Sequence, residues 1–143
     1  GRKGKTLASG EDVEWCYLIQ LLGYKVYYDH RLTFLHDMPE GRMNWSYYLR
    51  LKQGIASGTG KLLPYRCLLE SKESSVFHYY FIWLKCFLLS SLLYFKYKVK
   101  FFNKEVLEDE ERLVEIILKA KMKSYLNTTF IAYEHFKQLK QLL

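Results

Sequence analysis

The chain has 143 residues, the size of one ordinary domain, and half of them are apolar. That apolar content suffices for a packed core and argues against a disordered chain. The formal net charge of +7 favours anionic partners such as phosphates, nucleotides, nucleic acid or acidic lipid, without choosing among them. Three widely spaced cysteines predict neither a disulfide framework nor a zinc site, and they fit a reducing compartment.

The first predicted element is a helix over residues 10–22. Ser9 is the expected N-cap, with Asp12 three residues later as in a capping box. Gly23 is placed to end the helix. The buried stripe of this helix is expected to consist of Trp15, Leu18, Ile19 and Leu22.

Alternating apolar and polar residues predict two short strands next, over residues 24–28 and 32–36, joined by a turn at 29–31. A second helix is predicted over residues 44–56. The glycine-containing stretch SGTGK at 57–61 is expected to be flexible and to divide the chain.

Two parts are therefore expected, residues 1–63 with mixed structure and a helical extension over residues 64–143. Residues 76–95 form an almost continuous apolar run that is long enough to span a bilayer. Lys85 in its middle makes a span costly. Three arrangements stay open: a helix lying in the membrane interface, a buried hairpin helix, and a transmembrane span. Further lysines follow at positions 96, 98, 100 and 104, and they favour contact with anionic head groups.

Two charged amphipathic helices are predicted to close the chain, over about residues 105–126 and 127–143. Glu115 and Lys119 are spaced as an i,i+4 pair. The acidic run at 108–111 is most simply a solvated helix start, and no chemistry is expected there.

Glu11 and Asp12 stand side by side after a glycine, where the first helix begins. The helix dipole and free N–H groups stabilise an ionised carboxylate at this place, and a general base must be ionised at neutral pH. Plain capping of the helix is the alternative, and these residues alone favour it.

A wider set of motifs changes that balance, because residues 1–63 resemble the C-terminal half of the catalytic domain in family 2 glycosyltransferases. The family often has Gly-Glu-Asp-x-Glu-Leu-Cys, then Leu-x-Gly-Tyr-Lys, then a strand that ends in His. Trp15 stands where leucine is usual. The stretch RMNWSYYLRLKQG continues the resemblance. The matching residues are Gly10, Glu11, Asp12, Glu14, Cys16, Leu22, Gly23, Tyr24, Lys25 and His36.

The resemblance implies an α+β, mostly helical chain: the C-terminal fragment of a GT-A α/β domain, with one helix and two short strands, followed by a helical tail. It also implies transfer of a sugar from a nucleotide-sugar to an acceptor hydroxyl with inversion, using a divalent metal (Mg or Mn). By the same resemblance Asp12 is the general base and Glu11 shapes the acceptor site. Glu14 and Trp45 would contact the acceptor, although packing is the favoured explanation for Trp45.

His36 would lie near the metal, with the adjacent Asp37 as a weaker candidate, while the pattern alone makes His36 a core residue. Arg42, Arg50 and Lys52 would hold the donor diphosphate, and their alternative is a solvated basic face. The Gln-x-x-Arg-Trp motif of processive relatives is absent, which argues against a polymer synthase.

No Asp-x-Asp motif precedes Glu11, so the chain is expected to be the C-terminal part of a longer enzyme and inactive alone. Assembly of bacterial cell-surface polysaccharide or glycolipid would suit it, with a glycan or lipid-linked acceptor, at the cytoplasmic face of the bacterial inner membrane. The rival interpretation is a basic, helical, non-catalytic module that binds membrane or protein. No specific nucleic acid is expected. The sequence leaves the oligomeric state open.

Overall fold

The structure, a computed structural model, describes residues 10–104, 106 and 108–143. Helices and irregular segments make up this part of the chain, which contains no strand, so the expected α/β fragment with two strands is wrong. In chain order the elements are α1 (Glu11–Leu21), the short 3-10 helix η1 (Glu40–Arg42), α2 (Trp45–Ser57), α3 (Leu63–Glu70), α4 (Val76–Lys100) and α5 (Asp109–Leu142).

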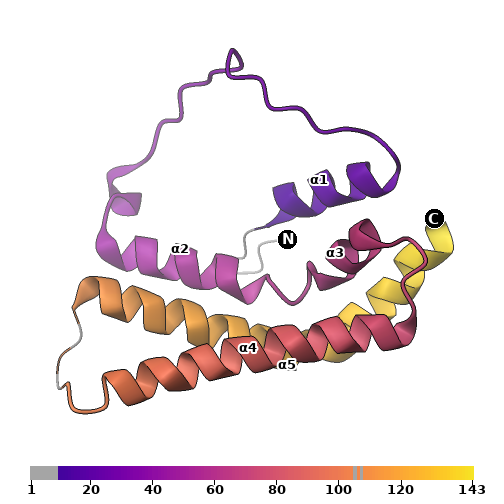
Figure 1. Ribbon diagram of the computed structural model, residues 1–143. Coiled ribbons are helices and arrows are strands. Elements are labelled where there is room, and N and C mark those ends of the chain that lie inside the picture. The colour runs from indigo at the N-terminus through magenta and orange to yellow at the C-terminus, as the bar shows by residue number, and fades with distance from the viewer. Residues whose placement is uncertain (1–9, 105, 107) are drawn as a thin grey trace.

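The two longest helices, α4 and α5, form an antiparallel hairpin that supports the other elements (Figure 1). The indole Nε1 of Trp83 on α4 donates a hydrogen bond of 3.0 Å to the carbonyl oxygen of Tyr125 on α5. Nearer the open end of the hairpin, the rings of Tyr79 and Phe136 lie 4.8 Å apart, and both side chains are fully buried. The hairpin is therefore held along its length by aromatic side chains of α4.

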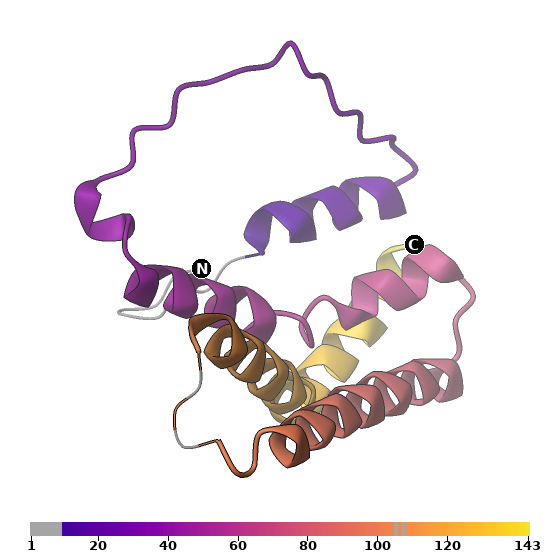
Figure 2. The same cartoon turned by 60° about the vertical axis from the view of Figure 1, so that its left-hand side comes forward.

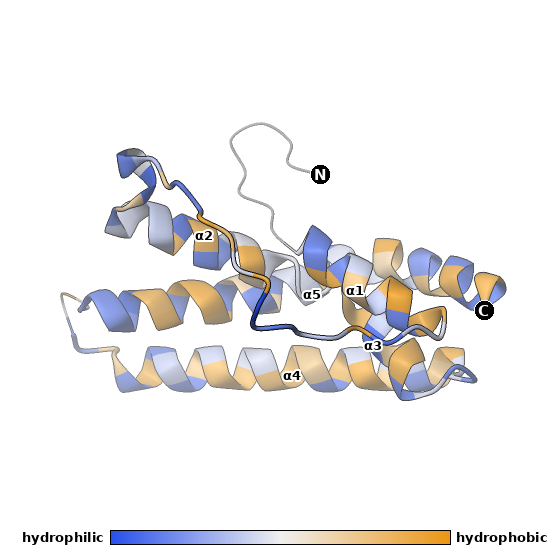
Figure 3. Cartoon of the chain, turned by 90° about the horizontal axis from the view of Figure 1, so that it is seen from above, coloured by the Kyte–Doolittle hydropathy of each residue, from blue (hydrophilic) through white to orange (hydrophobic). Residues whose placement is uncertain are grey.

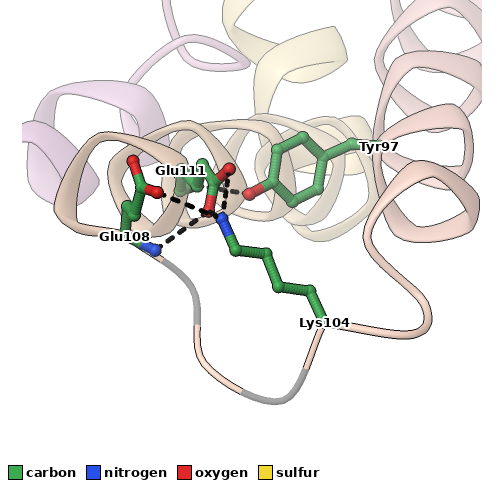
Figure 4. A network of polar contacts seen from close by, with 4 residues as sticks. All are labelled: Tyr97, Lys104, Glu108 and Glu111. Carbon is green, nitrogen blue, oxygen red and sulfur yellow. Dashed lines mark hydrogen bonds and ion pairs between the residues drawn. The ribbon is translucent and has the colours of Figure 1, made fainter.

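A polar network closes the hairpin at its turn (Figure 4). Lys104 Nζ donates to both carboxylate oxygens of Glu111, at 2.8 and 2.7 Å, and the Glu108 amide donates to the same carboxylate at 2.9 Å. The Tyr97 hydroxyl donates to the backbone carbonyl of Glu111 at 2.6 Å. These contacts lower the pKa of Glu111, chiefly through Lys104 and then through the Glu108 amide. The acidic helix start is thus a joint between α4 and α5 as well as a solvated surface.

The segment between α2 and α3 packs tightly against the middle of α5, where a flexible spacer was predicted. The Gly60 amide donates to Ser124 Oγ at 2.9 Å, and Ser124 Oγ donates to the Ser57 carbonyl at 2.7 Å. A Cβ on Gly60 would approach the Ser124 carbonyl oxygen to 2.8 Å, so only glycine fits without a shift. Glycine is needed here for close approach of two backbones, and not for flexibility.

The core lies where α3 meets α1, α4 and α5. Leu21 comes from α1, Tyr79 from α4 and Phe136 from α5, and each is at most 1% exposed. α3 lies at the start of the predicted helical extension, although its bounds were not predicted; Pro64 in its first turn suits a helix start. The buried residues that α3 contributes are Leu63, Pro64, Tyr65, Cys67 and Leu68.

Residues 24–39, where two strands were predicted, form a long irregular segment that arches away from the helices (Figures 1 and 2). The predicted turn between them is present, with the Leu32 amide donating to the Asp29 carbonyl at 3.1 Å and Asp29 paired with Arg31. An isolated hairpin is marginal in water without further strands or a covering helix. No neighbouring strand exists among the described residues to pair with either half.

The first helix begins and ends close to the predicted bounds, but its buried face differs. Its N-cap is Gly10, while the predicted cap Ser9 lies outside the described residues. Gly23 ends the helix with a φ of +92°. Leu18 is partly buried as predicted, but Trp15, Ile19 and Leu22 are exposed; Tyr17 and Leu21 face the core instead.

The two helices predicted after residue 105 are one continuous helix, α5. The predicted break fell at Asn127, beside two threonines that favour helix interiors only weakly. Both threonine hydroxyls bond back to carbonyls one turn earlier, Thr128 to Ser124 at 2.6 Å and Thr129 to Tyr125 at 2.7 Å. Packing against the neighbouring helices thus overrides the weak local preference.

Candidate functional site

The acid pair lies in the first turn of α1, where both carboxylates are exposed. Gly10 precedes them with a φ of +126°, a backbone conformation that residues other than glycine rarely adopt. Its carbonyl accepts the Glu14 amide at 2.9 Å and so begins the helix. This glycine fixes the angle at which the chain enters α1, immediately before the two exposed acids.

Glu14, one turn further on, has a different environment. Tyr65 Oη of α3 donates a hydrogen bond of 2.7 Å to Glu14 Oε1, and His135 Nε2 of α5 lies 2.8 Å from the same Oη. Because the phenol proton points to Glu14, the imidazole must donate through Nε2–H. Burial, and secondly Glu14, raise the pKa of Tyr65 well above its ordinary value, so the phenol stays protonated.

This chain of contacts joins three helices by their side chains. Glu14 was predicted to contact the acceptor, but in the structure its Oε1 accepts a hydrogen bond from the Tyr65 hydroxyl. It anchors α1 on α3 while Glu11 and Asp12 remain at the surface. Of the three acids, Glu14 therefore has a structural role that sequence analysis did not anticipate.

A second place of chemical interest is an open cavity of about 690 Å³ between the start of α2 and the start of α5. Two residues predicted for function, Arg42 and Trp45, both line it. The Asn44 side chain caps α2 by accepting the Tyr47 amide at 2.8 Å. The complete lining is Arg42, Met43, Asn44, Trp45, Tyr48, Glu110, Leu113 and Val114.

The aromatic wall of this cavity is formed by residues one turn apart on one face of α2. The rings of Trp45 and Tyr48 stack with centroids 5.3 Å apart, and Lys52 Nζ lies 5.2 Å from the Tyr48 centroid. Lys52, predicted to hold a diphosphate, is thus partly engaged by an aromatic face. An aromatic wall with an Arg and a Glu nearby has the mixed character of small-molecule sites, including sites for sugar rings.

The cavity and the acid pair lie at opposite ends of α2. Gly10 lies beside Leu62, just beyond the C-terminal end of α2, whereas Trp45 is the first residue of that helix. A helix of 13 residues is about 20 Å long. The structure therefore does not bring Asp12 together with Trp45 or Arg42.

The other predicted ligands lie apart from both places. His36 and Asp37 are exposed in the irregular segment after the turn, and Arg50 is exposed on α2. Within the described residues, no three His, Cys, Asp or Glu side chains gather as a metal site would require. His36 and Asp37 alone do not make such a site.

Sequence analysis missed the partners that α3 and α5 supply. Tyr65 is 51 positions from Glu14, and His135 is 70 positions from Tyr65, so no local pattern connects them. Glu110, Leu113 and Val114 line the cavity from one face of α5, and their i, i+3, i+4 spacing is the one signal that was available.

Comparison of the chain with protein-family models, with curated proteins and with solved structures found no match. The resemblance to family 2 glycosyltransferases therefore depends on the motifs of residues 10–36 and on the stretch that follows them.

Proposed function

We propose that the chain is the acceptor-side part of an inverting glycosyltransferase, with Asp12 as the general base. The observation that carries this proposal is the exposed acid pair in the first turn of α1, set by a glycine of positive φ within the motif Gly-Glu-Asp-x-Glu. The nucleotide-sugar would be held by a further part of the enzyme, because the described residues offer no metal-assisted diphosphate site.

The uncovered side of α1 supports the presence of such a further part. Trp15 and Leu22 are 65% and 57% exposed on the face of α1 that turns away from α3. The irregular segment that follows exposes large apolar side chains as well, including Tyr28, Phe34 and Leu35. Large apolar side chains left exposed on α1 and on the segment after it favour a covering partner. These side chains begin next to the acid pair, where a donor-binding part would have to lie.

The chemistry asked of Asp12 is a single proton transfer. The acceptor oxygen attacks the anomeric carbon, the bond to the nucleotide diphosphate breaks, and the hydroxyl proton passes to the Asp12 carboxylate. Asp12 lies in the first turn of α1, at the positive end of the helix dipole. Glu11, its neighbour in the same turn, would orient the acceptor hydroxyl group.

The test replaces Asp12 by Asn in the full-length protein and measures release of nucleoside diphosphate from a panel of nucleotide-sugars. General-base removal should lower kcat by about 10²- to 10⁴-fold while donor binding is unchanged. Asp109→Asn is the matched control, because Asp109 is an exposed acid in the first turn of α5 and loses a similar interaction with a helix dipole. Near-normal turnover of Asp12→Asn would reject the assignment.

The rival, a non-catalytic module that binds a membrane, has one observation in its favour, the exposed apolar side of α4. A module of this kind would tolerate Asp12→Asn without any loss of function. The two functions are compatible in one enzyme with a membrane-bound acceptor, so membrane binding alone does not decide between them.

A further inference from the structure

Helix α4 is apolar on two opposite sides, and only one of them is covered. Its inner side packs on α5 through residues such as Tyr79, Trp83 and Cys86. Figure 3 shows α4 along one edge of the molecule, with α5 on its inner side. The residues of the opposite side, here called the outer face, are Phe81, Leu84, Leu88, Leu92, Phe95 and Val99.

Each residue of the outer face is between 45% and 77% exposed, and they follow one another at intervals of three or four. That spacing places them in one stripe of the helix, about 27 Å long from Phe81 to Val99. α4 is also the one helix in the described part of the chain that is long and apolar enough to cross a membrane.

The charges around the outer face have one sign. The sequence has no Asp or Glu between residues 74 and 104, whereas it has lysines at 85, 96, 98, 100 and 104. Lys98 and Lys104 are paired with glutamates of the α5 side of the hairpin. Lys85 and Lys96 make no ion pair with any residue that the structure describes. Their separation of 11 residues is close to three turns, so both lie along the same border of the outer face.

The apolar stripe and its bordering lysines argue against two alternatives, a dimer through the outer face and a transmembrane helix. A second copy of the chain would set Lys85 and Lys96 against an equally basic face that carries no carboxylate. A transmembrane orientation would carry α5 into the bilayer beside α4, including the Lys98–Glu115 pair and the exposed Lys137–Glu134 pair. A layer with an apolar interior and an anionic surface, in contact with one side of α4, would bury the apolar stripe and pair with the lysines.

We propose that the outer face of α4 binds an anionic lipid surface, with the helix lying in the plane of the head groups. The Phe, Leu and Val side chains enter the acyl boundary, and Lys85 and Lys96 extend along it to lipid phosphates. This inference goes beyond sugar transfer and does not depend on it.

The first experiment is flotation of the protein with vesicles of phosphatidylcholine alone and of phosphatidylcholine mixed with phosphatidylglycerol. Binding to the anionic vesicles, weakened by salt, is the expected result. Leu88→Glu should lower that binding at least about tenfold, because a carboxylate replaces an inserted apolar group beside anionic lipid. Ile55→Glu on α2 is the matched control, because Ile55 is 46% exposed where Leu88 is 47% exposed, and it should bind like the unchanged protein. Circular dichroism checks that both variants are folded.

The lysines are tested as a pair. Lys85→Gln with Lys96→Gln should weaken binding to anionic vesicles about 30-fold. Lys25→Gln with Lys119→Gln removes the same charge from exposed positions elsewhere and should have a much smaller effect. Equal losses in the two double variants, or no binding of the unchanged protein to anionic vesicles, would overturn the proposal.

Depth measurements separate an in-plane helix from a spanning one. Phe81→Trp, Leu88→Trp and Phe95→Trp are each compared with the unchanged protein for quenching by brominated lipids. Equal, shallow depths are expected at the three positions. A tryptophan that is deep in the bilayer in Leu88→Trp, but shallow in Phe81→Trp and Phe95→Trp, would indicate a membrane-spanning helix. A stable dimer in light scattering, together with no binding of the outer face to vesicles, would indicate self-association. Either result overturns the proposal.

Discussion

Tyr65 and Glu14 are 51 residues apart in sequence, and the Tyr65 hydroxyl donates a hydrogen bond of 2.7 Å to the Glu14 carboxylate. This contact engages one of the three acids of the motif. It turns Glu14 toward α3, and Glu11 and Asp12 then face solvent. His135 contacts the same hydroxyl, so the position of the proposed base depends on α5 as well as on α3.

Tyr65→Phe should lower the free energy of unfolding by about 1–2 kcal/mol, because Glu14 and His135 both lose a partially buried hydrogen-bond partner. Urea unfolding followed by circular dichroism measures the loss. If Glu14 positions α1 for catalysis, turnover in the full-length protein should fall as well, by less than in Asp12→Asn.

Tyr79→Phe is the control for the lost hydroxyl, since Tyr79 is fully buried but its hydroxyl has no hydrogen-bond partner in the described part of the chain. Its removal should leave stability unchanged or raise it slightly, because a buried and unsatisfied hydroxyl is costly. If Tyr79→Phe destabilises the fold as much as Tyr65→Phe does, the effect lies in ring packing and the Glu14 contact has no special role.

Local signals in the sequence were sufficient for elements that depend on neighbours in the chain. The second helix was predicted over residues 44–56 from a local pattern, and the structure confirms it as α2, with Asn44 as its N-cap. Gly23 likewise ends α1 with the positive φ that only glycine adopts easily. The turn at Asp29 is another local feature, and it is present although the strands around it are not.

Features that depend on distant contacts were not predictable in this way. An alternating pattern over residues 24–36 is typical of a strand, but a strand also needs a partner, and the described chain provides none. The buried side of α1 was misassigned because α1 is apolar on two sides, and only α3 decides which one is covered. The cavity by Trp45 needs α5 at its other wall, which local reasoning does not place.

Gly60→Ala should destabilise the protein by about 1–3 kcal/mol, because the added methyl group meets the Ser124 carbonyl of α5 and no free space is left. Thermal unfolding measures this effect. Gly41→Ala is the matched control, because a Cβ there meets nothing within 4 Å. If SGTGK were a flexible linker, the two substitutions would change the thermal stability equally, and that result would contradict the packed turn.

Glu111→Gln should lower the stability of the protein, because it removes the ion pair with Lys104 at the turn of the α4–α5 hairpin (Figure 4). The loss should be several-fold smaller than that of Gly60→Ala, because solvent screens this pair. The folded state lowers the pKa of Glu111, so its stabilisation is present above the ordinary value of 4.5 and is lost as pH falls through the lowered value. Thermal unfolding should therefore show a difference between Glu111→Gln and the unchanged protein that is full at neutral pH and shrinks as the pH falls below 4.5.

Added salt should shrink the same difference, since exposed ion pairs are screened. Glu110→Gln is the control, as Glu110 neighbours Glu111 but makes no ion pair within the described residues. A destabilisation of Glu111→Gln that persists in high salt and at acidic pH would assign the effect to packing of α5, not to Lys104.

The buried thiol of Cys67 should make the stability of the fold depend on pH in the alkaline range. Its side chain is fully buried, and burial, followed by Glu70 and Cys86, raises its pKa from the ordinary value of 9.0 to about 12. The folded state therefore favours the neutral thiol, and its stabilisation is complete below about pH 9. Above that pH only the unfolded chain loses the proton, so stability falls by up to about 1.4 kcal/mol per pH unit until the pH reaches the folded pKa.

Urea unfolding between pH 8 and 11 tests this with Cys67→Ala as the comparison. The buried tyrosines titrate in both proteins, and the pKa of Tyr125 is raised to about 12 by burial, so the informative quantity is the difference in slope. The variant is less stable at pH 8 because it leaves a small cavity in the core. It should lose less stability than the unchanged protein as the pH rises. Parallel pH profiles would mean that Cys67 ionises freely, and they would contradict its burial between α1, α3 and α4.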